Sequence, residues 1–346
     1  MTHRTQAPSG DDLASSPLAG PPPVRVEPSP PPASRHHRRG RLTRRQRLSA
    51  WDVKLSPYLY ISPFFVLFAV VGLFPLAYTA YVSVFDWSLL GGKGDFVGLQ
   101  NFEDVLGNPY FLKSLVNTIS IFLLSSIPQV VIAVSLAGLL DTHLRGRTLW
   151  RMSILLPFVV SPVVVAIIFG NLFGDTYGLI NQALGYVGIE PIQWHTNRFA
   201  SHLAIASMVN WRWTGYNALI FLAAMQAVPR DLYESASLDG AGRVRQFLNI
   251  TIPMIRPTMI FVIITSTIGG LQIFAEPRLF DTTLAQNGGS DRQFGTLTML
   301  IYDFGWHLRD LGRASATAWL LFLLIVVIAL VNFLVSRRLN ALGGRR

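Results

Sequence analysis

Cysteine is absent from this chain of 346 residues, and charged residues are scarce. Without cysteine, the chain can form neither disulfides nor a metal site with cysteine ligands. Asp, Glu, Lys and Arg make up 14% of the residues, whereas about 25% is usual in soluble domains. Hydrophobic residues make up 51%, with 22 Phe and 8 Trp. The scarcity of charge therefore argues against a soluble globular protein and indicates a membrane protein.

The net charge of +10 does not indicate a nucleic-acid-binding protein, because Lys and Arg cluster at the N-terminus and between apolar runs. Residues 1–50 are rich in Pro, Ser and Arg and have too few apolar residues to form a core, so they are predicted to be a disordered cytoplasmic tail. The tail is too long and too polar for a signal peptide. His36-His37 is interpreted as part of a solvated basic segment near the membrane rather than as a metal site.

Six apolar runs follow the tail, and each is long enough to cross a bilayer as a helix, which takes about 20 residues. Irregular or extended backbone cannot face lipid, because its polar groups would lack partners, so these runs are predicted to be helices. The fifth run is the weakest, because Gly269-Gly270 interrupts it and Glu276 limits it. The predicted spans are residues 61–85, 115–140, 149–173, 203–226, 256–275 and 314–336.

The distribution of Lys and Arg predicts the orientation, since these residues are enriched on the cytoplasmic side of membrane proteins. If the N-terminus is inside, the inner segments are the tail, residues 141–148, residues 227–255 and the C-terminal end. These segments carry more cations than the outer segments, although the outer segments are longer. Both termini and the loop between the fourth and fifth spans are therefore predicted to be cytoplasmic.

That loop is polar and carries charges of both signs, although it lies between two apolar runs. Pro229 ends the fourth run, and Asp231 is placed to cap a short helix with Glu234 as its capping-box partner. Asp239-Gly240 is predicted to break this helix, and a second short helix follows. Because a polar helix–turn–helix cannot be buried in lipid, we expect it to lie at the cytoplasmic surface and to dock on a partner.

The same stretch resembles the EAA loop of ATP-binding-cassette importer permeases. The pattern of that loop is Glu-Ala-Ala, three residues, Gly, nine residues, Ile, one residue and Leu-Pro, and the spacing here fits throughout. Ser235 replaces an Ala and Ile252 replaces Leu. The matching residues are Glu234, Ala236, Gly240, Ile250 and Pro253.

Two longer stretches resemble the carbohydrate branch of these permeases: Trp211 to Ala241, which includes "LDGA" at 238–241, and Asp310 to Ile328. The resemblance covers residues 55–340. It implies an all-α integral membrane protein with six transmembrane helices, the type I importer permease architecture and a cytoplasmic coupling loop at 227–253. It also implies ATP-driven sugar import across the bacterial cell membrane by alternating access.

In this family, the first helix of the loop lies in a groove of a cytoplasmic ATPase. The resemblance therefore implies that Glu234 contacts the ATPase, that Ala236 and Ala241 allow close approach, and that Asp239-Gly240 forms the turn; alternatively, Glu234 only caps its own helix. The implied partners are a second permease subunit, two ATPase copies and an extracellular sugar-binding protein. The binding protein would dock on outer loops such as 86–114 and 276–313.

The sequence contains no Gly-x-x-x-x-Gly-Lys-Ser/Thr phosphate loop, so this chain cannot itself supply the ATPase. No Ser-His-Asp set, metal cluster or pair of carboxylates within a span is evident, and the His residues are assigned to tails or outer loops. We therefore expect no enzyme activity, cofactor, metal site or nucleic-acid partner. The alternative function is an ATP-independent secondary transporter or channel, which would need ionisable residues in its spans, where only Arg212 clearly qualifies.

Arg212 lies near the middle of the fourth predicted span, where a charge facing lipid would cost about 2.5–3.5 kcal/mol. It is therefore expected to face the bundle interior or a watery cavity and to line a sugar path, because sugars bind through polar groups and aromatic rings. A structural role, or a side chain that reaches out to the interface, is the alternative. Asn210, Trp211, Trp213 and Asn217 surround it, and Gln129, Gln272 and Glu276 are weaker path candidates.

Two further segments carry predictions. Apolar residues recur at helical spacing over 297–311, which predicts an amphipathic helix on the outer surface or a short re-entrant segment. Gly269-Gly270 is predicted to be either a bend beside the path or a site of close helix packing.

The stretch "GGLQIFAEPRLFD" (269–281) resembles permeases for β-linked glucosides and cello-oligosaccharides. The sugar is therefore expected to be an oligosaccharide or glycoside.

Overall fold

The computed structural model describes residues 44–142, 145–281 and 287–343, and most of these residues are helical. By its internal contacts the chain forms two compact units, residues 1–63 and 64–346. The predicted tail, including His36-His37, lies outside the described residues as far as residue 43. Helix α1 (Arg44–Phe68) begins before residue 50, where the tail was predicted to end.

The first apolar run is helical throughout. After α1, the chain continues as a π-helical segment, η1 (Ala69–Leu73), and as α2 (Phe74–Ser83). The stretch Leu55–Ser83 is long and apolar enough to cross a membrane. Its apolar side chains are exposed along nearly the whole length, so lipid or another subunit is needed to cover them.

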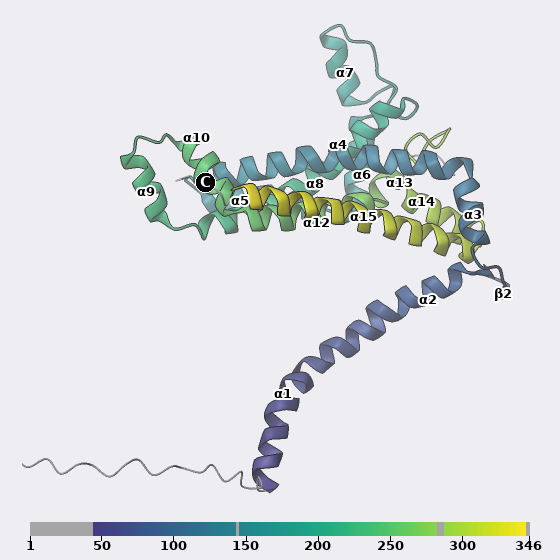
Figure 1. The fold of residues 1–346 in the computed structure, drawn as a ribbon. Coiled ribbons are helices and arrows are strands. Elements are labelled where there is room, and N and C mark those ends of the chain that lie inside the picture. Colours follow the sequence, from purple (N-terminus) through teal and green to yellow (C-terminus); the bar gives the residue numbers. More distant parts are fainter. Residues whose placement is uncertain (1–43, 143–144, 282–286, 344–346) are drawn as a thin grey trace, which may run out of the picture. The chain divides into compact units, whose positions relative to one another are not determined.

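Four long helices run alongside one another and form the bundle (Figure 1): α4 (Pro109–Leu140), α8 (Arg198–Gln226), α12 (Arg256–Leu271) and α15 (Leu311–Gly343). Helix α4 packs along α8 and against α12, and α12 packs against α15. Apolar side chains fill the spaces between them in three clusters.

Local sequence explains where two of these helices begin. The Asn108 side chain accepts a hydrogen bond from the backbone N–H of Tyr110, and Pro109 occupies the first turn of α4. At α8, the Asn197 side chain accepts from the N–H of Ala200 in the same way. Both are favoured N-terminal signals, because they satisfy backbone donors that have no partner within the helix.

The third predicted span is broken. It consists of α5 (Arg147–Val159) and α6 (Pro162–Leu172), which meet at an angle of 92°. Ser161 is extended, as expected for a residue before proline, and its side chain accepts from the N–H of Val163 to start α6. A straight helix over 149–173 was therefore wrong, because Pro162 cannot continue the helix that precedes it.

A bend also directly precedes the fifth predicted span. Residues Arg243–Met254 meet α12 at an angle of 71°. The break lies at Ile255, directly before Arg256 and Pro257. At the other end α12 stops at Leu271, so the last residues of the predicted span, up to 275, form a turn and the start of α13 (Ala275–Phe280).

Length and composition identify three helices that could each cross a membrane, or up to five if each bent pair forms one span. Helix α8 is not among them, although it contains the fourth predicted span and has 29 residues. It carries Arg198, Arg212 and several buried polar side chains. A helix whose polar residues face other helices can be less apolar than one that faces lipid.

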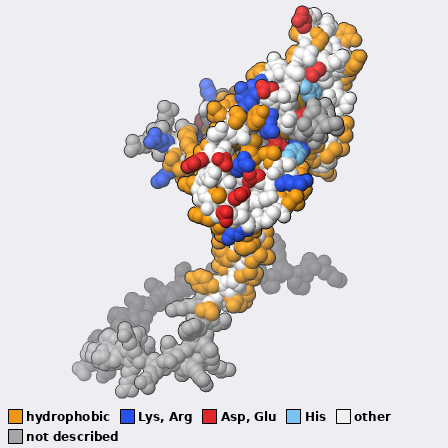
Figure 2. All heavy atoms as spheres, turned by 90° about the vertical axis from the view of Figure 1, so that its right-hand side faces the viewer, with side chains coloured by type: hydrophobic (Ala, Val, Ile, Leu, Met, Phe, Trp, Pro, Cys, Tyr) orange, Lys and Arg blue, Asp and Glu red, His pale blue; other side chains and the backbone are white. Residues whose placement is uncertain are grey.

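One end of the bundle carries a short β-hairpin that the all-α prediction did not include. Strands β1 (Phe85–Ser88) and β2 (Gly92–Phe96) pair antiparallel, and Gly92 adopts a φ of +72° at the turn. The short helix α3 (Gln100–Gly107) follows. Figure 2 views this end, where acidic and basic side chains mix with hydrophobic ones.

The segment predicted to be amphipathic over 297–311 forms α14 (Leu297–Tyr302) and a π-helical segment, η3 (Asp303–His307). Leu297, Leu300 and Phe304 are buried in a cluster with α4 and α15. Leu308 is exposed, because the helix ends before it. The apolar face is therefore covered by the chain's own helices.

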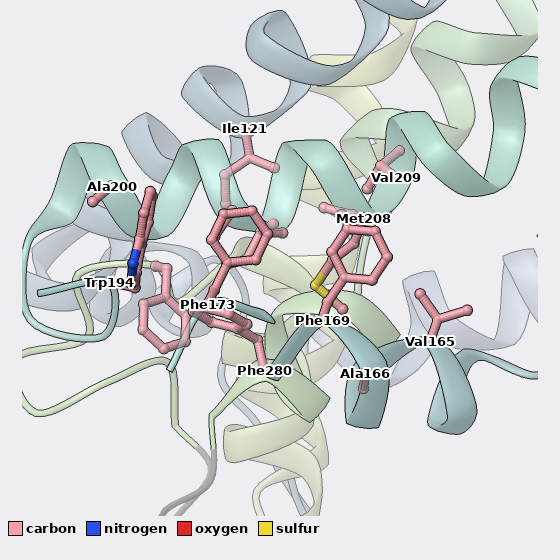
Figure 3. Packing of buried hydrophobic residues seen from close by; sticks show 14 residues of the cluster. Ile121, Val165, Ala166, Phe169, Phe173, Trp194, Ala200, Met208, Val209 and Phe280 are labelled. Atoms are coloured by element: carbon pink, nitrogen blue, oxygen red, sulfur yellow. The ribbon is translucent and has the colours of Figure 1, made fainter. Parts of the chain in front are cut away.

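Another cluster holds α6 and α13 against α8. Phe169, Phe173, Trp194, Met208 and Phe280 contribute its large side chains (Figure 3). The helix α7 (Leu179–Tyr186) projects from the bundle between α6 and α8 (Figure 1). Its buried Asn181 accepts hydrogen bonds from Ile192 N and from Trp194 Nε1, and so fixes the chain that returns to α8.

The opposite end of the bundle holds the loop between α8 and α12, near the C-terminal end of α15 (Figure 1). The loop consists of α9 (Arg230–Leu238), α10 (Arg243–Gln246), the π-helical η2 (Phe247–Thr251) and α11 (Ile252–Met254).

Candidate functional site

A cavity of about 490 Å³ lies among the bundle helices. Ligand sites in proteins commonly enclose about 300–1,000 Å³. Its walls come from α4, α8 and α12 and from the turn that leads into α13. The lining residues are Ser126, Gln129, Val209, Arg212, Trp213, Tyr216, Asn217, Ile220, Phe261, Thr265, Ser266, Gly269, Gly270, Gln272, Ile273, Phe274, Ala275 and Glu276.

An ion pair crosses this cavity between α8 and α13. Arg212 Nη1 donates to Glu276 Oε1 over 2.8 Å, and the side chains are only 14% and 8% exposed. The guanidinium carbon of Arg212 also lies 5.8 Å from the ring centroid of Trp213. Each charge reduces the cost of removing the other from water, so loss of one partner would leave the other buried and uncompensated.

A second polar link joins three helices. The Asn217 amide donates to Gln129 Oε1 over 3.1 Å and to Ser266 Oγ over 3.2 Å. These residues lie on α8, α4 and α12, so one side chain ties the three helices that form the cavity walls. In a low-dielectric bundle such a network favours one packing arrangement, because each polar group has few other partners.

The structure assigns different environments to the two adjacent glycines of α12. A β-carbon at Gly270 would lie 2.8 Å from both the Phe122 ring and the Ser126 hydroxyl, so Gly270 allows α12 to pack closely on α4. A β-carbon at Gly269 would meet nothing within 4 Å, and Gly269 faces the cavity. The helix continues through both residues, so the pair does not form a bend.

Most of the path candidates come together in this cavity. Arg212, Trp213, Asn217, Gln272 and Glu276 all line it, as does Gln129. The partner of Arg212 is a carboxylate of the same chain, which was not among the alternatives considered from the sequence.

Two of the residues around Arg212 lie elsewhere. Asn210 does not line the cavity, and neither does Trp211, whose ring lies 5.7 Å from that of Phe169. Trp211 and Asn210 lie one and two residues before Arg212 and so point to other sides of α8, since each step along a helix turns by about 100°.

Sequence reasoning missed Tyr216, Phe261 and Phe274, which give the cavity further aromatic walls. Tyr216 could have been found, because residues 209, 212, 213, 216, 217 and 220 recur at helical spacing on one face of α8. Phe274 could not, since its position depends on the turn after α12.

The loop at the other end of the bundle is an exposed helix–turn–helix. Helix α9 ends in a Schellman motif: Gly240 N donates to Ser237 O over 3.1 Å, and Ala241 N donates to Ala236 O over 2.9 Å. Gly240 has a φ of +77°, a conformation that costs a residue with a side chain about 1–2 kcal/mol. Leu238 and Val244 flank the turn and are 90% and 74% exposed.

The capping prediction for this helix was wrong. The N-cap of α9 is Pro229, and no side chain makes a capping hydrogen bond there. Asp231 lies inside the first turn, where its charge still interacts favourably with the helix dipole. Glu234 is exposed on the following turn. Without a capping role, the carboxylate of Glu234 is available to a partner.

Two hydrogen bonds hold the loop together, and one packing contact attaches it to α4 of the bundle. Tyr233 Oη and Thr251 Oγ1 lie 2.9 Å apart and join α9 to η2. Gln246 Nε2 donates to Ser237 Oγ over 2.8 Å. Phe247 packs on Gly138 of α4, where a β-carbon would lie 2.7 Å from the ring. Ile250 is partly buried in the same cluster, and Pro253 lies in α11.

One histidine departs from its predicted place. His202 is buried on α8, where its ring nitrogens lie 2.9 Å from Ser120 Oγ and 2.9 Å from Gln293 O. It therefore links α8 to α4 and to the segment before α14. Among the described residues, no group of three or more His, Asp or Glu side chains could hold a metal ion.

A helical bundle with several membrane-length apolar helices, an internal cavity and an exposed loop at one end defines the class of a membrane transport subunit. Within that class, the chain belongs to the family described as binding-protein-dependent transport system inner membrane component, which matches residues 108–342.

Known relatives cover most of the chain. It is 34% identical to the arabinooligosaccharides transport system permease protein AraP of Halalkalibacterium halodurans, over 81% of this chain and 87% of the relative. It is 32% identical to the sn-glycerol-3-phosphate transport system permease protein UgpA of Pectobacterium atrosepticum, over 82% of this chain and 95% of the relative.

The fold also matches a solved structure. A chain of the bacterial alginate ABC transporter, crystallised with an alginate pentasaccharide-bound periplasmic protein, superposes with a TM-score of 0.69. The match covers 85% of this chain and 97% of that one, at 21% identity. The permease fold implied by the EAA loop is thereby confirmed.

Proposed function

We propose that this chain is a membrane-spanning subunit of an ATP-driven sugar importer in a bacterial cell membrane, and that its cavity forms part of the sugar path. The observation that carries the proposal is the exposed loop 231–253, which is packed on helices that also line the cavity. Since the sequence lacks a phosphate loop, ATP hydrolysis would be performed by two copies of a separate cytoplasmic subunit.

The coupling would run through α9. Glu234, Leu238 and Ala241 belong to the exposed turn region that would enter a groove on the ATPase, with Gly240 forming the turn. Movement of that groove would reach α4 through Phe247 and Gly138, and α4 carries Gln129 in the cavity wall. Alternating access would then be a change in packing of α4, α8 and α12.

The topology we propose has six spans and both termini in the cytoplasm. The bent pair α5–α6 would be the third span and α8 the fourth. The loop lies near the C-terminal end of α15 (Figure 1). This supports a topology in which the loop and the C-terminus are on the same, cytoplasmic side of the membrane.

The opposite, outer end would receive an extracellular sugar-binding protein. The two outer loops predicted to dock it, 86–114 and 276–313, are joined directly. Leu89 N donates to Arg309 O over 2.8 Å, and Ser88 pairs with Asp310 as an isolated bridge. A protein that docks there would press on both loops at once and so on the ends of α4 and α15.

The sugar would be an oligosaccharide or glycoside. The stretch 269–281, which resembles permeases for β-linked glucosides and cello-oligosaccharides, supplies seven of the residues that line the cavity: Gly269, Gly270, Gln272, Ile273, Phe274, Ala275 and Glu276. The resemblance therefore falls on the residues that would meet the substrate. A second permease subunit would complete the path.

The test is a charge reversal at the loop. In cells that express the transporter with the Glu234→Lys variant, we expect sugar uptake to fall by at least about tenfold, because a buried charged contact is commonly worth 2–5 kcal/mol. The variant should also fail to retain the ATPase when this chain is purified in mild detergent. Glu190→Lys is the matched control, since Glu190 is an exposed carboxylate before α8 and outside the loop.

An ATP-independent transporter is the alternative function. The observation that favours it is the buried Arg212–Glu276 pair, because ion-coupled transporters place ionisable groups inside their spans. Uptake that persists in vesicles without ATP, with no ATPase co-purifying, would support this alternative and overturn the proposed function.

A further inference from the structure

The charges in the cavity balance. Among the described residues that line it, those with charged side chains are Arg212 and Glu276, which carry opposite signs and form an ion pair at 2.8 Å. The remaining polar lining consists of uncharged amides and hydroxyls. The part of the path that this chain supplies is therefore electrically neutral, with uncharged polar groups among apolar side chains.

The ion pair leaves hydrogen-bonding capacity for a ligand. Arg212 uses Nη1 for Glu276, whereas its buried Nε has no hydrogen-bond partner among the described residues. The Nε atom is buried and therefore not accessible to a ligand, but 14% of the Arg212 side chain is exposed. The exposed Gln272 amide on the cavity wall can both donate and accept.

The cavity walls also suit flat, partly apolar ring faces. Trp213 and Tyr216 are neighbours on α8, with ring centroids 6.1 Å apart, and Phe274 adds a third ring from the turn after α12. An aromatic face is electron-rich and attracts the weakly positive C–H groups of a pyranose ring. Rings combined with neutral amides match a polyhydroxylated solute without a formal charge.

We infer that this cavity selects uncharged saccharides over sugars that carry a carboxylate or phosphate, and that Glu276 determines this specificity by neutralising Arg212. The inference rests on the proposed function and narrows its substrate class. Family membership leaves the charge open, since the names of the relatives include both arabinooligosaccharides and sn-glycerol 3-phosphate. An anionic sugar would meet the Glu276 carboxylate, whose side chain is only 8% exposed, and like charges at a buried site repel by several kcal/mol.

The test compares two probes that differ in one group. Methyl β-D-glucopyranoside and methyl β-D-glucopyranosiduronate share ring and linkage, but C6 is a hydroxymethyl group in one and a carboxylate in the other. Binding is measured in nanodiscs that hold the transporter complex with the full chain, as the change in tryptophan emission. A Trp213→Phe complex identifies the part of the signal that comes from the cavity.

We expect the wild-type complex to bind the glucoside at least about tenfold more tightly than the glucuronide. In Glu276→Gln the Arg212 charge is uncompensated, so the preference should disappear or reverse. In the matched double variant R212Q/E276Q the cavity is neutral again. The glucuronide should therefore bind more weakly than it does in Glu276→Gln. If Glu276→Gln fails to assemble, the reversed pair R212E/E276R carries the test, because it keeps zero net charge and should keep the preference for the glucoside.

Equal binding of the two probes, tighter binding of the glucuronide, or an unchanged ratio in Glu276→Gln would each overturn the inference. Failure of both probes to bind the wild type at tens of millimolar would overturn it as well. None of these results alters the outcome of the Glu234→Lys uptake test. Conversely, uptake that needs no ATP would overturn the proposed function even if the probe ratio is as expected.

Discussion

The single residue with the largest consequences is Arg212. Its sequence position in an apolar run predicts that it avoids lipid, but only the fold brings Glu276, 64 residues further along the chain, to within 2.8 Å. The pair holds α13 to α8, and both side chains line the cavity. A structural role and the proposed path role, which are alternatives in the sequence, are therefore compatible in this geometry.

Replacement of Arg212 by Leu is expected to destabilise the chain by about 3–5 kcal/mol, because Glu276 is then buried without its partner. The double variant R212L/E276L should recover most of that loss, since no unpaired charge remains. Thermal unfolding of the detergent-solubilised complex measures both. Equal unfolding temperatures for R212L and wild type, with uptake intact, would contradict both the packing and the path roles of Arg212.

Asn217 offers a second test at this scale. Asn217→Ala removes the donor to Gln129 and Ser266, and we expect a loss of about 1–2 kcal/mol because the Gln129 carbonyl loses a buried partner. Ser266→Ala should cost less, since Asn217 keeps its bond to Gln129. Denaturant unfolding of the two variants side by side provides the measurement. A larger loss for Ser266→Ala would show that the network is centred elsewhere.

At the scale of elements, the exposed loop and the two bent helix pairs determine what the bundle can do. Proline explains the bends: Pro162 starts α6 after an extended Ser161, and Pro257 follows the break before α12. The chain turns by 92° between α5 and α6 and by 71° before α12, which a continuous helix would not allow. The loop is fixed at both ends to helices of the cavity and is exposed at its turn.

The turn itself can be tested with two adjacent glycines. Gly240 has a φ of +77°, whereas Gly242 has a φ of −68° and is open to an ordinary residue. Gly240→Ala should therefore weaken the Schellman turn by about 1–2 kcal/mol and reduce sugar-stimulated ATP hydrolysis by the complex. Gly242→Ala should leave both the stability of the turn and the rate of ATP hydrolysis close to wild type. Identical effects of the two variants would mean that the backbone conformation of the turn does not matter for coupling.

The contact between Phe247 and Gly138 is the most direct link between the loop and α4. Gly138→Val places a side chain where the Phe247 ring now lies, so we expect coupling to fall while the ATPase stays bound. Phe247→Ala in the same chain should restore part of it by making room. The ratio of sugar transported to ATP hydrolysed is the quantity to measure. If Phe247→Ala does not restore coupling in the Gly138→Val chain, the contact between these residues does not transmit motion.

At the scale of the whole molecule, the apolar helices separate two ends of different character. One end holds the loop and the C-terminal part of α15, and the other holds the hairpin, α3 and α14 (Figures 1 and 2). The joined segments 86–114 and 276–313 lie at one end of α4, and the exposed loop 231–253 lies at its other end. Signals from a binding protein and from an ATPase would therefore meet in the same helix.

The absence of cysteine makes the topology directly testable, because single cysteines can be introduced without a background. In right-side-out vesicles, Lys93→Cys on β2 should react with a membrane-impermeant maleimide. Arg245→Cys in the loop should react only after the vesicles are opened. Labelling of Arg245→Cys from outside would reverse the orientation and separate the loop from any cytoplasmic ATPase.

By itself, the sequence determined the helical membrane class, the approximate positions of most helices and the loop with Gly240 at its turn. These follow from local causes: apolar runs long enough for a bilayer, and residues whose conformational preferences act over one or two turns. It also located three of the cavity residues on α8, Arg212, Trp213 and Asn217, because polar and aromatic side chains there interrupt an apolar run.

Tertiary structure alone decided the partner of Arg212, the hairpin, the burial of His202 and the contact of Phe247 with Gly138. The first and last of these join residues far apart in the chain, and the others depend on which neighbour satisfies a polar group or covers an apolar one. These contacts depend on how side chains of different helices pack together, so they cannot be predicted from the periodicity of a single segment.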